Sequence, residues 1–147
     1  MFNERVRHMM ASERLVTAPL QTSVQEAARL MAQAGSGVVL VMDGEALAGV
    51  FTSRDAVLRV LAEGRDADAT PLSQVMTANP VTVEPDRPFG TALKLMQQHA
   101  IHHLPVVERG KPVGVVSARN ALDPELEDFI CESVRREGFE PPDPSRH

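Results

Sequence analysis

Two short segments place a hydroxyl three residues before a carboxylate or an amide: Thr52 with Asp55, and Ser117 with Asn120. The two oxygens of a carboxylate match the two neighbouring hydroxyl donors of a ribose. Hydrogen bonds to a charged acceptor contribute about 1.5–3 kcal/mol each. Each segment opens a predicted helix, whose free N–H groups and dipole attract anions such as phosphate. Arg54 could add positive charge to the first segment.

The same spacing has a second interpretation. A Thr-x-x-Asp or Ser-x-x-Asn segment at a strand-to-helix junction is also favoured by helix capping, in which the side chains satisfy free backbone N–H groups. The residues alone leave capping and ligand binding open at both segments. Because Asn120 is neutral and offers a single oxygen, we expect its site to be weaker than that of Asp55, or to select a different ligand.

Three histidines, His99, His102 and His103, lie together at the end of a predicted helix. A metal site is one interpretation, but no acidic or cysteine partner is nearby in the sequence. Alternatively, His99 interacts with the dipole at the helix C-terminus, and His102 or His103 flanks a ligand cleft. We therefore predict no metal site. Since no P-loop, nucleophile elbow or Cys/His arrangement stands out, we also predict no enzymatic activity.

An internal repeat provides the elements that hold these residues. Residues 15–57 align without gaps with residues 80–122, an offset of 65 positions. Each copy predicts the order β-α-β-β-α, in which a tight turn such as Asp43-Gly44 joins the last two strands. The predicted elements lie around 16–17, 24–31, 38–42, 47–51 and from 52 in the first copy, and around 81–82, 89–96, 104–107, 112–116 and from 117 in the second. Gly64 and Pro124 are expected to end the two last helices.

The segments outside the two copies are predicted to be a short lead-in helix, a polar linker and a C-terminal helix. We divide the chain into a first repeat with its lead-in (1–64), a linker (65–72), a second repeat (73–123), a C-terminal helix (124–138) and a flexible tail (139–147). One face of the C-terminal helix carries Leu126, Phe129, Ile130 and Val134. This face is predicted to pack on its own module or on a second copy.

Composition limits the functions open to the chain. Its 147 residues are 43% hydrophobic and 24% charged, which suits a globular core. A net charge of −5 and the lack of Trp and Tyr argue against nucleic-acid and anionic-membrane binding. The single cysteine is compatible with a reducing compartment, and the longest aliphatic run is too short to span a bilayer. We expect a cytoplasmic protein.

The ordered set of motifs resembles a tandem pair of CBS domains, also called a Bateman module, over about residues 8–123. The segments that carry the resemblance are GVFTSRD (49–55), GVVSARN (114–120), HHLPVV (102–107) and VMT (75–77). The chain departs from the family pattern at Leu40, where a proline is missing, and at Asn120, which replaces an aspartate. The resemblance implies an α+β (mixed alpha-beta) fold with two β-α-β-β-α CBS repeats related by pseudo-two-fold symmetry, plus a C-terminal helix.

The resemblance also implies a non-catalytic regulatory sensor that binds an adenosine-type ligand in the cleft between the two copies. AMP, ADP or ATP is favoured over S-adenosylmethionine or NADH. In this family the aspartate accepts hydrogen bonds from the ribose, the Thr or Ser contacts phosphate or ribose, and the His-x-Leu-Pro strand edge holds the adenine. The corresponding candidate residues are Thr17, Val38, Gly49, Val50, Thr52, Arg54, Asp55, Thr82, His102, His103, Leu104, Pro105, Val115, Ser117, Arg119 and Asn120.

The partners implied by the resemblance are a second copy of the chain and an unknown regulated protein. We expect a homodimer that uses the apolar helix faces at 24–31 and 89–96 and that of the C-terminal helix. The alternative function is a ligand-free CBS scaffold or protein-interaction module whose site has degenerated. The departures at Leu40 and Asn120 favour that alternative.

Overall fold

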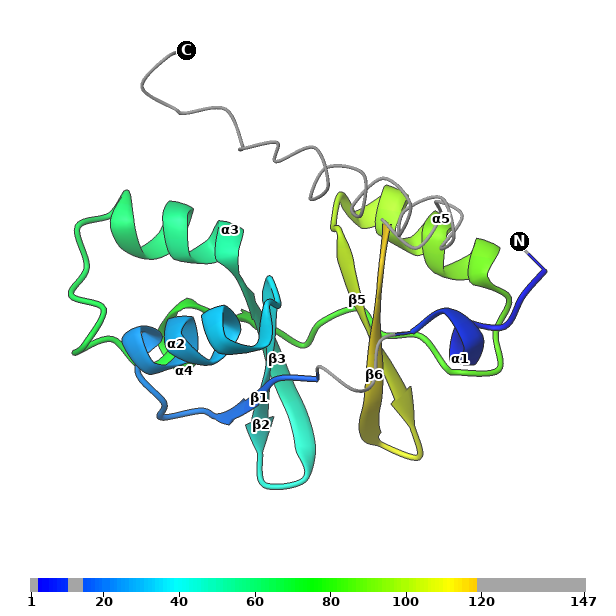
Figure 1. Cartoon of the computed structure of the whole chain (residues 1–147), viewed down its shortest axis with the longest axis horizontal. Helices are drawn as coiled ribbons and strands as arrows, with labels where there is room; N and C mark the ends of the chain where they lie inside the picture. The colour runs from blue at the N-terminus through cyan, green and yellow to red at the C-terminus, as the bar shows by residue number, and fades with distance from the viewer. Residues whose placement is uncertain (1–2, 11–14, 119–147) are drawn as a thin grey trace, which may run out of the picture.

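The computed structural model describes residues 3–10 and 15–118, which form two β-hairpins side by side with helices packed around them (Figure 1). The elements before the middle of the chain are α1 (Val6–Met9), β1 (Thr17–Pro19), α2 (Val24–Ala34), β2 (Val38–Asp43), β3 (Ala46–Thr52), α3 (Ser53–Asp55) and a π-helix, η1 (Ala56–Leu61). They are followed by α4 (Leu72–Val75), β4 (Thr77–Ala78), α5 (Phe89–His99), β5 (His103–Glu108) and β6 (Lys111–Ser117).

The strands form one sheet in the order β1-β2-β3-β4 and a second sheet of β5 and β6. Only β1 and β2 are parallel; the other pairs are antiparallel. The register shifts at equivalent places in the two hairpins, after Val41 and after Val106. The mixed fold with two related repeats confirms the predicted fold class. The predicted C-terminal helix lies outside the described residues.

Two local details differ from the sequence prediction. The first hairpin loop is Gly44-Glu45, one residue later than predicted, because Asp43 still pairs with Ala46 in the ladder. The extended segment predicted around 81–82 forms a single bridge between Val83 and Val106 rather than a strand. The last helix of the first copy continues from α3 into η1, and Gly64 follows with a positive φ of 69°.

The two long helices bury their apolar faces in separate cores. Ser23 caps α2 by accepting a hydrogen bond from the backbone N–H of Glu26 at 3.1 Å. The apolar residues of α2 and α5 that are buried in the two cores are Val24, Ala27, Met31, Phe89, Ala92 and Met96. The prediction that these faces stay exposed for dimerisation is therefore wrong. An apolar stripe on a helix can pack into a core or into an interface, and here the hairpins cover both stripes.

Each lead-in helix packs on the repeat to which it is not directly joined. Figure 1 shows α1 beside the second hairpin and α4 beside the first. Val6 of α1 is fully buried in the core of the second repeat. Leu72 of α4 is fully buried in the core of the first. The two repeats are therefore interlocked, and neither core is complete without a segment from the other part of the chain.

The exchange follows the internal symmetry down to single backbone hydrogen bonds. Antiparallel bridges join Arg5 to Pro88 and, equivalently, Pro71 to Ser23. Three further pairs of backbone hydrogen bonds match, the first of each pair at α1 and the second at α4. Val6 N donates to Arg87 O (2.8 Å) as Leu72 N does to Thr22 O (2.9 Å), and Arg7 N donates to Pro85 O (2.8 Å) as Ser73 N does to Leu20 O (3.0 Å). In the third pair the main helix donates: Phe89 N to Glu4 O (2.6 Å), and Val24 N to Thr70 O (2.9 Å). Both main helices thus begin at a junction made by two distant segments.

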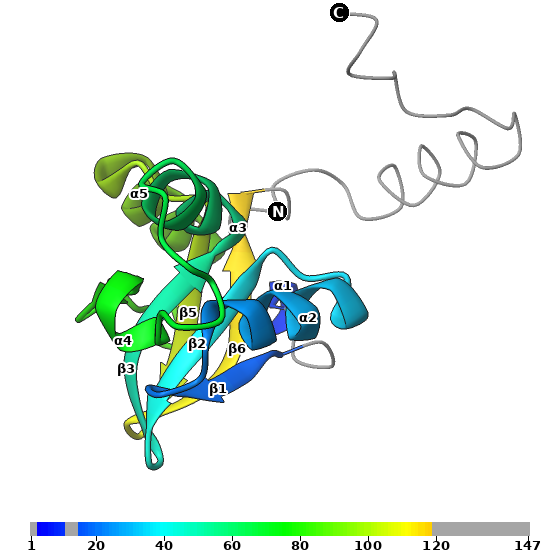
Figure 2. The ribbon, with the colours of Figure 1, turned by 90° about the vertical axis from the view of Figure 1, so that its left-hand side faces the viewer.

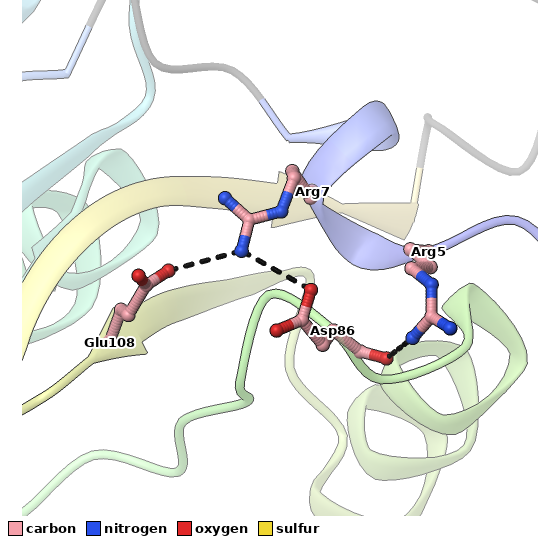
Figure 3. Close-up of polar contacts among 4 residues, drawn as sticks. All are labelled: Arg5, Arg7, Asp86 and Glu108. Carbon is pink, nitrogen blue, oxygen red and sulfur yellow. Dashed lines mark hydrogen bonds and ion pairs between the residues drawn. The ribbon is translucent and has the colours of Figure 1, made fainter.

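Charged side chains add to the docking of α1 (Figure 3). Arg7 donates to Asp86 and to Glu108, each at 3.2 Å. Arg5 donates to the backbone carbonyl of Asp86. The hydrogen bond to Asp86 is the main reason why the pKa of Arg7 is raised above its ordinary value. These exposed pairs orient α1, whereas most of its docking energy is expected from the burial of Val6.

The interlocked cores predict that a change in α4 weakens both repeats. Leu72→Ala should lower the free energy of unfolding by about 2–5 kcal/mol, because it removes buried methyl groups and leaves a cavity. Amide hydrogen exchange should show equal loss of protection in β2 and β5. Gln74→Ala, an exposed change on the same helix, should stay within about 0.5 kcal/mol of the wild type. Loss of protection in one hairpin alone would contradict the interlock.

Candidate functional site

Several of the candidate residues lie at the open ends of the two hairpins, opposite the turns. Val38 pairs with Thr52 at this end of the first hairpin, and His103 pairs with Ser117 at the same end of the second. A Cβ placed on Gly37 would lie 3.8 Å from both Cε1 and Nε2 of His103. The residue before β2 therefore lies beside the first residue of β5, and the two repeats meet here.

The Thr52–Asp55 segment forms the capping box that its spacing allows. The Thr52 hydroxyl oxygen accepts from the Asp55 backbone N–H at 3.2 Å, and Asp55 Oδ2 accepts from the Thr52 backbone N–H at 2.9 Å. Asp55 Oδ1 lies 3.6 Å from Nε of Arg59, and the Asp55 side chain is only 16% exposed. Each carboxylate oxygen thus has one protein partner. Because such an oxygen can accept a second hydrogen bond, capping leaves acceptor capacity for a ligand.

Arg59 extends this contact to the other half of the chain. Its Nη1 donates to the backbone carbonyls of Val75 and Met76, at 3.1 and 3.2 Å. Asp55 is therefore linked through one side chain to the segment that leads from α4 into β4. Sequence reasoning missed Arg59, although its position four residues after an aspartate on a helix was an available signal.

A cavity of about 350 Å³ opens between the repeats beside these residues. Arg54 contributes from the first repeat and His102 from the second, so two of the candidate residues line it. Figure 1 and Figure 2 show α3 and α5 at the same end of the hairpins, opposite the turns. The remaining lining residues are Leu93, Met96, Gln97, Ala100, Ile101 and Ala118. Cationic, polar and apolar groups are thus combined in one cleft.

Several candidate residues support this end of the molecule from inside. Leu104 and Pro105 are fully buried in β5. Val38 and Val115, also buried, pack with Leu40 in a small core between the hairpins, against which Val50 is partly buried. These side chains join the repeats rather than line the cavity. Leu40, the departure from the family motif, is thus a fully buried contact between the repeats.

Gly49 has a structural role that accounts for the missing side chain. A Cβ at this position would lie 2.7 Å from the Thr77 carbonyl oxygen and 2.6 Å from the Met76 sulfur. Gly49 pairs with Ala78 of β4. Of the two alternatives for this glycine, close approach of a ligand or of another backbone, the structure shows the second.

Thr17 and Thr82 lie away from this cleft. Thr17 lines a different cavity, of about 490 Å³, near the hairpin turns, where Lys111 and Glu45 form an ion pair at 3.2 Å. Thr82 is exposed beside the single bridge of the second copy. Arg119 and Asn120 lie outside the described residues. The structure therefore brings together the candidates around Thr52 and His103, whereas Thr17 and Thr82 lie elsewhere.

Within residues 3–10 and 15–118, no three His, Cys, Asp or Glu side chains lie close enough together to hold a metal ion. No helix there is long and apolar enough to cross a membrane.

Known proteins share both the sequence pattern and the fold. The family model for the CBS domain matches twice, over residues 6–62 and 72–124. The CBS domain-containing protein YhcV of Bacillus subtilis is 39% identical over 112 residues, which cover 76% of this chain and 79% of that protein. An uncharacterized conserved protein from Pyrococcus horikoshii has a TM-score of 0.77 and 31% identity, over 88% of this chain and 94% of that one.

A second similar structure contains a nucleotide. It is a CBS domain protein from Pyrobaculum aerophilum complexed with AMP, with a TM-score of 0.75 and 25% identity over 88% of this chain and 99% of that one. The two matches of the family model fall on the two hairpin repeats and include the helix that leads into each. The chain therefore belongs to the CBS-domain family and carries two CBS domains in tandem.

Proposed function

We propose that this regulatory CBS pair binds an adenosine-type ligand, with AMP, ADP or ATP favoured, in the cleft between its two repeats. The observation that carries the proposal is the cavity lined by Arg54 from one repeat and His102 from the other. Its volume of about 350 Å³ lies within the range of about 300–1,000 Å³ typical of small-molecule sites. A ligand that touches both repeats can change how they sit together, and so pass a signal to a partner protein.

The lining of the cleft suits the parts of a nucleotide. Arg54 supplies a cation for phosphate, and Asp55 on the same turn retains acceptor capacity for ribose hydroxyls. Leu93, Met96 and Ile101 offer an apolar wall for a base. The relative from Pyrobaculum aerophilum, solved with AMP, supports the choice of ligand class. We propose a non-catalytic cytoplasmic protein, with S-adenosylmethionine and NADH as less favoured ligands.

One observation favours the alternative of a ligand-free scaffold. Both oxygens of Asp55 already have protein partners, Thr52 and Arg59, so this carboxylate has a structural role without any ligand. Under this alternative the Thr-x-x-Asp motif serves only to cap the helix and to connect it with the segment after α4. The two functions differ in whether a nucleotide binds, and the next two experiments separate them.

Thermal unfolding with AMP, ADP, ATP, S-adenosylmethionine and NADH tests for a ligand. A compound at 100 times its dissociation constant stabilises the folded chain by about 2.7 kcal/mol. We therefore expect at least one adenine nucleotide to raise the unfolding midpoint by several degrees, since about 1 kcal/mol shifts a chain of this size by a few degrees. An unchanged midpoint with all five compounds at millimolar concentration would favour the scaffold.

Asp55→Asn tests the role of the carboxylate. The amide oxygen can still accept from the Thr52 backbone N–H, so the helix cap is largely retained. Loss of the charge should weaken nucleotide binding by about 1.5–3 kcal/mol, or roughly ten- to a hundred-fold, as measured by calorimetry. Asp43→Asn, an exposed change beside the hairpin turn, serves as the matched control. Equal affinity in the two variants would remove Asp55 from the binding site.

The homodimer also remains a proposal, and it rests on the family resemblance. Its contact has to lie outside the apolar faces of α2 and α5, because these are buried in the two cores. We expect sedimentation at micromolar concentration to show one species of twice the 16.0 kDa chain mass. A single species of the chain mass would show that the protein is a monomer.

A further inference from the structure

The helix η1 carries an apolar patch that the described structure leaves uncovered. Val57, Leu58 and Leu61 are 53%, 50% and 70% exposed, and no other large hydrophobic residue in the described ranges is exposed. The opposite side of the helix is anchored by Val60, which is 1% exposed and belongs to the core of the first repeat. The patch therefore faces away from its own repeat, and contiguous apolar surface of this kind marks a contact site.

Exposed arginines lie at both ends of the patch. Arg54 precedes Val57 by three residues on the same helix, and Arg65 lies just past the helix end, where its backbone N–H donates to the Val60 carbonyl at 2.9 Å. An antiparallel copy of this helix would bring Arg54 of one chain towards Arg65 of the other. Because like charges at both ends oppose that pairing, the patch fits a partner with an apolar centre and acidic flanks better than a second copy of itself.

The sequence that follows the described residues has this composition. Residues 123–138 carry the apolar stripe of Leu126, Phe129, Ile130 and Val134 at helical spacing. The acidic residues in this segment are Asp123, Glu125, Glu127, Asp128, Glu132 and Glu137, and the basic ones are Arg135 and Arg136. The stripe is thus flanked mainly by acids, opposite in sign to the arginines beside the patch.

The chain also leaves the described structure close to the patch. Ala118, the last described residue, lines the same cavity as Arg54 at the start of the helix. The eight residues from Ala118 to Leu126 reach up to about 26–29 Å when extended. The helix from Arg54 to Leu61 rises only about 10 Å. The connection is therefore long enough to seat the apolar stripe on the patch of the same chain.

We propose that residues 123–138 dock as an amphipathic helix on the Val57–Leu58–Leu61 patch of their own chain. The contact buries both apolar surfaces and sets the acidic flanks against Arg54 and Arg65. The C-terminal segment then covers the outer face of the helix that follows the Thr52–Asp55 cap, next to the cleft between the repeats.

The chain's only cysteine, Cys131, lies in this segment and takes a nitroxide spin label without any other substitution. In the full-length, isotope-labelled protein, the label should broaden the amide signals of residues 54–65 and leave those of both hairpin turns sharp. The variant Leu61→Glu should abolish the broadening. The control Ala32→Glu, an equally charged change at an exposed position of α2, should retain it. Reduction of the nitroxide gives the reference spectrum.

A mixed sample separates docking within one chain from docking between chains. Isotope-labelled Cys131→Ser protein is combined with spin-labelled protein of natural isotopic abundance. The proposal predicts that the amide signals of residues 54–65 broaden when one chain carries both the isotope label and the spin label, and that they stay sharp in the mixture. Equal broadening in the mixture would show that the segment of a second copy occupies the patch. That result, sharp signals in both samples, or broadening that survives Leu61→Glu would overturn the proposal.

Discussion

The reciprocal exchange of the two lead-in helices is the constraint on which the rest of the structure depends. Val6 completes the core of the second repeat, and Leu72 completes that of the first. Each repeat therefore needs the short helix that precedes the other repeat in the sequence. A repeat of this size buries little apolar surface and is only marginally stable alone. The exchange offsets this deficit and also fixes the two hairpins side by side, with their open ends together.

The site follows from that arrangement. Once the open ends are held together, Gly37 lies beside His103, and Arg54 and His102 line one cleft that both repeats form. Asp55 belongs to the same system of contacts, because Arg59 connects its carboxylate to the backbone after α4. A ligand that used the spare acceptor capacity of Asp55 would therefore act on the joint between the repeats, which is a physical basis for a regulatory role.

Sequence reasoning predicted what repeats and periodicity encode: two hairpins, the amphipathic helices and, as one of two interpretations, the Thr52–Asp55 cap. It could not assign the lead-in helices to their cores, because one turn of helix with only one or two buried apolar residues carries no information about which hairpin it meets. It placed the apolar faces of α2 and α5 at a dimer interface, because the sequence pattern of an apolar helix face is the same in an interface and in a core. Thr17 was grouped with Asp55 by motif alone, and the fold separates them.

We propose above all that a nucleotide binds at the joint between the two repeats. The most direct measurement is the set of backbone amide shifts during an AMP titration of the full chain. We predict that the shifting signals come from both repeats at the open ends, including Gly37, Ser53, His103 and Ala118, while the turns near Gly44 and Gly110 stay unchanged. Shifts confined to the cavity beside Thr17 and Lys111, or to one repeat, would contradict the account.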